Sequence, residues 1–203
     1  MKKILIILFL IAFSLIVLSN KIEGSISQNI DISIKGEEVG IIFSKQGDNE
    51  FILLKTSKSV IFLPVSEPDG NELKVIRKLG IKKLDYSYSR SIKAKQFLDY
   101  KNQLQIENIK IYKEGENTII DLGEEKFCIY KEGKLPKLSY IFFVNEGKIN
   151  NDSIKLSFYS ENVSEEFEKV LYKRWIDIYK VRKAEFTFVK FSGEDYNVVR
   201  IPN

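Results

Sequence analysis

Few side chains of this 203-residue chain could do chemistry, because it contains no histidine and only one cysteine. Neutral imidazole is the commonest zinc ligand and the usual general base near neutral pH. Its absence excludes Ser-His-Asp and Cys-His catalytic sites and every histidine-based metal site. The cysteine, Cys128, lies in an alternating stretch at 126–130. We interpret it as a small buried hydrophobe, since no imidazole could activate its thiol.

Carboxylates and tyrosines are the next groups to consider. The acidic pairs Glu124–Glu125 and Glu165–Glu166 suit a solvated turn and a helix N-terminus better than acid–base catalysis. No convergent set of acids can be named, so an enzyme that uses carboxylates or lysine without a metal is only the third hypothesis. The tyrosines, all on expected strands except Tyr100, fit sheet packing rather than a stacking platform for bases or sugars. They are Tyr86, Tyr88, Tyr100, Tyr112, Tyr130 and Tyr140.

The N-terminus indicates the compartment. Lys2 and Lys3 precede an uninterrupted apolar run from Ile4 to Leu18, which is the layout of a secretory signal peptide. The run is shorter than the roughly 20 residues that span a bilayer comfortably, and an uncleaved N-terminal anchor is the alternative. We therefore expect residues 1–20 to be a signal peptide or membrane anchor, and the rest to be extracytoplasmic, secreted or tethered to the membrane through this segment.

The charge balance limits the class of partner. The chain has 32 Lys and Arg residues against 28 Asp and Glu residues, a net charge of +4. Lys2 and Lys3 belong to the export segment, so the folded part is close to neutral. The net charge therefore does not support nucleic-acid binding, which usually needs a large excess of positive charge. The partner is unknown from sequence; an anionic ligand and an envelope protein both remain open.

The element order predicts one mixed α/β domain at residues 30–203, behind a polar lead at 21–29. Helical spacing predicts three helices, at 71–79, 92–105 and 164–181. Alternating or continuous apolar runs predict the strands. The expected strands lie at 31–35, 39–43, 51–54, 60–63, 81–88, 106–112, 118–121, 126–130, 140–144, 153–159, 186–191 and 197–201.

Several of these segments resemble a known family. Residues 41–48 and 51–56 are similar to the opening strand, "GQGD" turn and second strand of the metallo-β-lactamase-like hydrolase domain of ComEC-type DNA-uptake (competence) proteins. Residues 75–86 resemble the helix and strand that lead to that family's metal motif, and residues 150–156 its later "NNxSxVL" strand. The resemblance covers 38–160. It implies an α+β fold of αββα type: a degenerate metallo-β-lactamase-like four-layer sandwich, with its later ligand strand shortened, behind the N-terminal apolar segment.

The same resemblance implies that the zinc site is lost. In active members, a His-x-His-x-Asp-His loop binds two zinc ions; here Ser91 and Lys93 stand at the first two histidines, Lys95 at the aspartate and Gln96 at the last histidine. A lysine ammonium has no free lone pair and repels a divalent cation. We therefore expect no metal, no cofactor and no catalytic residue. With Arg90, these residues form a candidate anion-binding loop, and an ordinary solvated loop is the alternative.

Two non-catalytic hypotheses precede the metal-free enzyme. The first is an exported or membrane-anchored domain of the degenerate hydrolase fold, which acts by binding. The second is a structural or interaction protein of the cell envelope with an unrelated mixed α/β fold.

Overall fold

A computed structural model describes residues 32–46, 49–99, 103–134, 138–148, 153–160, 163–174, 177–183, 185–193 and 195–202. The expected signal peptide or anchor at 1–20 and the polar lead at 21–29 lie outside these residues. Ile32–Asn203 forms a compact unit. Within its described part, neither helix has the length and apolar character needed to cross a membrane.

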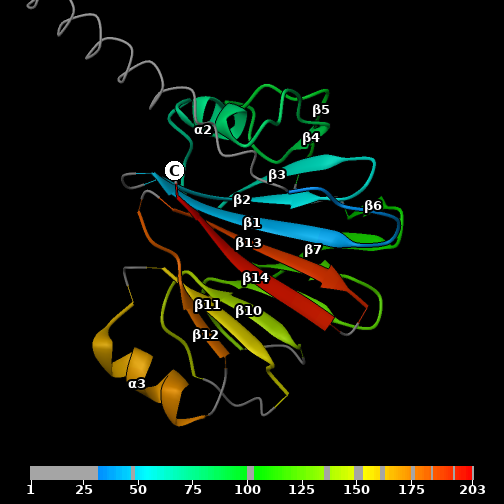
Figure 1. Cartoon of the computed structure of the whole chain (residues 1–203). Coiled ribbons are helices and arrows are strands. Elements are labelled where there is room, and N and C mark those ends of the chain that lie inside the picture. The colour runs from blue at the N-terminus through cyan, green and yellow to red at the C-terminus, as the bar shows by residue number, and fades with distance from the viewer. Residues whose placement is uncertain are drawn as a thin grey trace, which may run out of the picture. The chain divides into compact units, whose positions relative to one another are not determined.

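The first sheet contains seven strands in the order β14-β13-β1-β2-β3-β4-β5 (Figure 1). Neighbours from β14 to β3 are antiparallel, whereas β4 and β5 add in parallel. The first three strands follow the apolar runs of the sequence, joined by short turns as in a meander. The bounds are β1 Val39–Gln46, β2 Asn49–Lys55, β3 Val60–Pro64, β4 Tyr86–Ser87, β5 Gln96–Phe97, β13 Glu185–Ser192 and β14 Asp195–Pro202.

The second sheet also contains seven strands, in the order β12-β11-β10-β9-β8-β7-β6. Strands β6 to β9 form an antiparallel meander, and β9 to β12 are parallel. Both faces of β10 and β11 are buried, which explains their continuous apolar runs. The bounds are β6 Leu104–Ile106, β7 Ile109–Glu114, β8 Asn117–Asp121, β9 Lys126–Tyr130, β10 Tyr140–Phe143, β11 Leu156–Tyr159 and β12 Asp177–Lys180.

The two sheets pack face to face around an aromatic core. Alternate residues of β1 point inward, and Phe43 lies at the centre of the cluster. Its ring stacks on Phe158 at a centroid distance of 4.5 Å and lies 5.3 Å from Phe142 and 5.8 Å from Phe127. Residues from one sheet and from three strands of the other therefore share a single hydrophobic core.

One short helix packs on the outer face of each sheet (Figure 1). Helix α2 (Glu72–Lys78) covers the first sheet with Val75 and Ile76, and it ends before Gly80, whose φ of +73° suits a residue without a side chain. Helix α3 (Glu165–Lys173) covers the second sheet; its Phe167 ring lies 4.9 Å from Phe143. Ser164 caps α3 by accepting a hydrogen bond from the Phe167 amide.

The expected α+β four-layer αββα sandwich is wrong. Strands account for 47% of the structure and helices for 11%, and α2 and α3 are the only helices in the described residues. Two expected helices account for the difference. Residues 92–105 contain two bends, strand β5 and the start of β6, apart from 100–102, which lie outside the described part. The helix expected at 164–181 ends at Lys173, and residues 177–180 pair with β11 as a strand.

A hydrogen bond joins the edge strands of the two sheets, and its tyrosine makes the free energy of unfolding depend on pH in the alkaline range. The Tyr196 hydroxyl of β14 donates to Asp177 Oδ2 of β12 at 2.7 Å. Burial, followed by this bond, raises the pKa of Tyr196 above its ordinary value of 10.0. The unfolded chain therefore loses this proton first. We expect the free energy of unfolding to fall as the pH rises above about 10.

Urea unfolding at a series of alkaline pH values tests this prediction. Replacing Tyr196 by phenylalanine should cost about 1 kcal/mol near neutral pH, because the bond is lost, and should flatten the alkaline decline. Burial also raises the pKa of Tyr88 and Tyr159, so part of the decline should persist. An unchanged alkaline slope in Tyr196→Phe would contradict the assignment to Tyr196.

Candidate functional site

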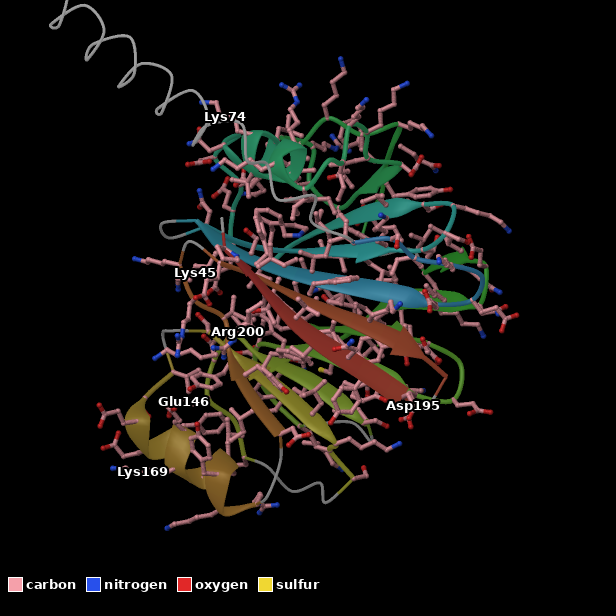
Figure 2. The ribbon with its side chains drawn as sticks, in the orientation of Figure 1. Lys45, Lys74, Glu146, Lys169, Asp195 and Arg200 are labelled. Atoms are coloured by element: carbon pink, nitrogen blue, oxygen red, sulfur yellow. The ribbon has the colours of Figure 1, made fainter. Side chains whose placement is uncertain are left out.

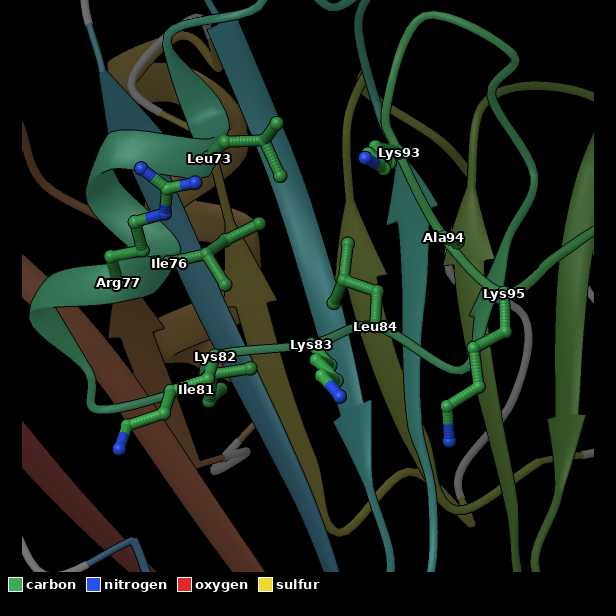
Figure 3. A pocket seen from close by; sticks show the side chains of 10 residues that line it. All are labelled: Leu73, Ile76, Arg77, Ile81, Lys82, Lys83, Leu84, Lys93, Ala94 and Lys95. Carbon is green, nitrogen blue, oxygen red and sulfur yellow. The ribbon is translucent and has the colours of Figure 1, made fainter.

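A pocket of about 460 Å³ lies between α2 and the loop that joins β4 to β5 (Figure 3). Three segments build it: α2, the connection at 81–84, and residues 93–95. Because α2 covers the outer face of the first sheet, the pocket lies on that face and not between the two sheets.

The lining combines cations with an aliphatic floor. Half of the ten lining residues are basic and half are apolar, and none is acidic. Figure 3 shows basic side chains on all three segments around the apolar ones. The basic residues are Arg77, Lys82, Lys83, Lys93 and Lys95, and the apolar residues are Leu73, Ile76, Ile81, Leu84 and Ala94. We call this site the basic pocket.

One of the five cations is neutralised by an acid. Lys95 forms an ion pair with Asp85, and the other carboxylate oxygen of Asp85 accepts the Val60 amide at 2.9 Å. The charged groups of the other four form no ion pair with the described residues. They are Arg77, Lys82, Lys83 and Lys93. Four like charges around one pocket repel one another and attract an anion.

Serine hydroxyls and backbone pairing hold the loop that carries Lys93 and Lys95. The Ser87 hydroxyl donates to the Ser89 carbonyl at 2.8 Å, and the Ser89 and Ser91 hydroxyls are 2.7 Å apart. Beyond this turn, Ile92 is fully buried and anchors the chain. The Lys95 amide then donates to the Leu84 carbonyl at 3.1 Å. The loop is therefore pinned against the 81–84 connection, which brings the two sets of lysines together.

Of the five residues in the candidate anion-binding loop, the structure places only two in the pocket. Lys93 and Lys95 line the basic pocket, whereas Arg90, Ser91 and Gln96 are exposed nearby without lining it. Sequence reasoning missed Arg77, Lys82 and Lys83. The sequence did contain a signal for these basic residues, because the segment 70–99 has eight Lys and Arg residues against three Asp and Glu residues.

The basic pocket does not fit the zinc site that the family resemblance implies for active members. Lys93 and Lys95 offer protonated amines, which have no lone pair for a metal. Among the described residues, no group of three or more His, Cys, Asp or Glu side chains could hold a metal ion. The chemistry available in the pocket is the binding of negative charge.

A second cluster, at the end of the sheet interface, is polar but inaccessible. Lys45 Nζ lies 3.0 Å from Glu50 Oε1, and the Ser160 hydroxyl donates to the same oxygen at 2.5 Å. Lys45 and Glu50 are only 3% and 5% exposed, and Ser160 is fully buried. A substrate cannot reach this serine, so we assign the cluster a structural role that ties β1 and β2 to the end of β11.

Cys128 is also structural. It is fully buried in the cluster beneath α3, and burial raises the pKa of its thiol to about 12. The reactive thiolate is therefore scarce at neutral pH. This agrees with the interpretation of Cys128 as a buried hydrophobe.

No protein-family model matches the chain, and no curated protein is significantly similar to it.

Proposed function

We propose that this chain is an exported or membrane-anchored, non-catalytic domain that acts by binding an anionic ligand in the basic pocket. The observation that carries the proposal is that four cations, which form no ion pair with the described residues, line one pocket with an aliphatic floor. Like charges held together without acidic partners weaken a fold, and a bound anion offsets that repulsion. Export is inferred from the apolar N-terminal run.

The pocket contains no group that would turn binding into catalysis. Its polar lining is entirely Lys and Arg, without a carboxylate, hydroxyl or thiol. An arginine cannot act as a base. Lys82, Lys83 and Lys93 have exposed side chains, and catalytic lysines normally depend on burial to lose their proton. Recognition without reaction is the function that these side chains support.

A second candidate is a structural or interaction protein of the cell envelope whose fold is unrelated to the hydrolase family. The mostly β architecture favours it, because in the described residues each sheet carries a single short helix where the family resemblance implies full helix layers. Membership of the ComEC-type hydrolase family stays a prediction. Both candidates are binding proteins, and they differ in whether the basic pocket or another surface makes the contact.

Lysine footprinting of the full chain in a neutral detergent tests the first candidate. Pyrophosphate should slow the acetylation of Lys82, Lys83 and Lys93 severalfold relative to chloride at equal ionic strength, because an anion bound among them shields their amines. Lys58 and Lys110, exposed lysines outside the pocket, serve as internal controls and should react equally in both salts.

A variant that removes two of the pocket's positive charges tests whether the protection depends on them. In Lys83→Gln/Lys93→Gln, pyrophosphate should no longer protect Lys82, whereas Lys58→Gln/Lys110→Gln should leave that protection intact. Equal protection of pocket and control lysines in the parent protein would mean that pyrophosphate binds nonspecifically, and it would reject the proposal.

A further inference from the structure

We propose that the basic pocket and Phe97 together form a docking surface for an anionic lipid bilayer. This inference rests on the proposed function, because it names the source of the anions that the pocket binds: the phosphodiester headgroups of a membrane surface. Three observations carry it, namely the segregation of charge, the position of Phe97, and the amphipathic lining of the pocket.

Positive charge is concentrated in the layer that contains α2, β4 and β5. Residues 70–99 have a net charge of +5, from eight Lys and Arg against three Asp and Glu, within a chain of net charge +4. The rest of the chain is therefore at −1. In Figure 2, nitrogen-tipped side chains, Lys74 among them, project from this layer. A nearly neutral chain thus carries a local excess of positive charge in this segment, which suits an extended anionic surface.

Phe97 is a large apolar side chain exposed on the same face. It is 49% exposed and lies in β5, the edge strand, paired with Ser87 of β4. Tyr86 packs against the core between the sheets, so alternation places Ser87 and its partner Phe97 on the outer face, which α2 covers. The other exposed large hydrophobics among the described residues lie outside the basic segment: Val170, Tyr172 and Val199.

A bilayer surface satisfies both parts of this arrangement. Headgroup phosphates pair with lysines and arginine, while an exposed aromatic ring enters the boundary between headgroups and acyl chains. The aliphatic floor of the pocket offers contact to the glycerol and upper acyl region of one lipid. If the N-terminal apolar segment is retained as an anchor, it holds the domain near a bilayer and raises the effective concentration of lipid at this surface.

The test uses the full chain in nanodiscs of phosphatidylcholine alone or mixed with phosphatidylglycerol. We expect Lys82, Lys83 and Lys93 to be acetylated more slowly in the anionic discs, and Lys58 and Lys110 to react equally in both. High salt should remove the difference. Because each basic residue near an anionic surface adds roughly a fivefold gain in binding, Lys83→Gln/Lys93→Gln should weaken binding of this surface to the anionic lipid more than tenfold and remove most of the protection of Lys82.

The position of Phe97 is tested by fluorescence. A Phe97→Trp variant in anionic discs should be quenched by lipids brominated in the acyl chain, with the parent protein, whose single tryptophan is Trp175, as background. The inference is overturned if the new tryptophan is not quenched, or if the pocket lysines react alike in neutral and anionic discs.

The outcomes separate this inference from the proposed function. Protection by pyrophosphate without protection by anionic discs leaves the anion-binding proposal standing and rejects the bilayer. Protection by single-stranded DNA but not by the discs also rejects the bilayer and assigns the surface to nucleic acid. Protection by none of the three anions rejects both proposals.

Discussion

Replacing Glu50 by glutamine is expected to lower the free energy of unfolding by about 3–5 kcal/mol, as measured by urea denaturation. The carboxylate is 5% exposed and accepts two contacts on one oxygen, from Lys45 Nζ at 3.0 Å and from the Ser160 hydroxyl at 2.5 Å. Glutamine keeps the shape but removes the charge. The Lys45 ammonium, 3% exposed, would then stay buried without a counter-ion.

Because of its position, loss of this ion pair should destabilise both sheets. Lys45 and Glu50 face each other across β1 and β2, whereas Ser160 follows β11 in the other sheet. The cluster therefore joins the two sheets at one end of their interface, and the variant should weaken both. A loss well below about 1 kcal/mol would show that water enters and solvates the lysine, contrary to the burial described.

Two controls distinguish loss of the pair from loss of side-chain volume. The double variant Lys45→Met/Glu50→Leu removes both charges and should recover most of the stability, because apolar replacements of buried ion pairs are often neutral or stabilising. At the exposed pair Lys126–Asp121, where the atoms are 3.5 Å apart and Lys126 is 42% exposed, Lys126→Gln should cost less than about 1 kcal/mol.

Replacing Phe43 by alanine is expected to cost about 3–5 kcal/mol, the range for buried aromatic residues that leave a cavity. Phe43 is 1% exposed and contacts three rings of the opposite sheet, those of Phe127, Phe142 and Phe158. Residues on β9, β10 and β11 would lose a shared neighbour. Thermal unfolding should move to lower temperature, and urea denaturation should give the free energy.

Matched variants show whether burial causes this loss. Phe97→Ala removes the same atoms from a side chain that is 49% exposed, and it should change stability by no more than about 0.5 kcal/mol. Phe43→Leu keeps much of the volume and should cost about 1–2 kcal/mol. If Phe43→Ala and Phe97→Ala were equally mild, the aromatic core between the sheets would be misplaced.

The strands of this protein were largely predictable because their signal is local. Short apolar runs such as 39–43 and 51–54 indicate buried strands, and the alternating stretch 126–130 indicates a half-buried one, without reference to the rest of the chain. These runs coincide with β1, β2 and β9. The helix at 71–79 was predictable for the same reason, since Gly80 ends α2.

The helix expected at 92–105 does not form, and the helix expected at 164–181 forms only as far as Lys173, because tertiary contacts override helical spacing. Ile92 is buried, and the amides of Lys95 and Gln96 bond to carbonyls of the 84–85 segment, so the chain there extends beside β4. Residues 177–180 add to the edge of the second sheet beside β11. The sequence pattern does not contain these partners, which lie elsewhere in the chain.

The sequence alone determined which kinds of chemistry are absent, since a chain without histidine cannot hold a histidine-based metal site, and it pointed to Lys93 and Lys95 as cations in one loop. Only the tertiary structure placed Arg77, Lys82 and Lys83 around them and brought Ser160 to Glu50. The physical reason is the separation along the chain over which each kind of information acts. Residue type and spacing act over a few positions, whereas a pocket or a buried ion pair depends on which distant segments the core brings together.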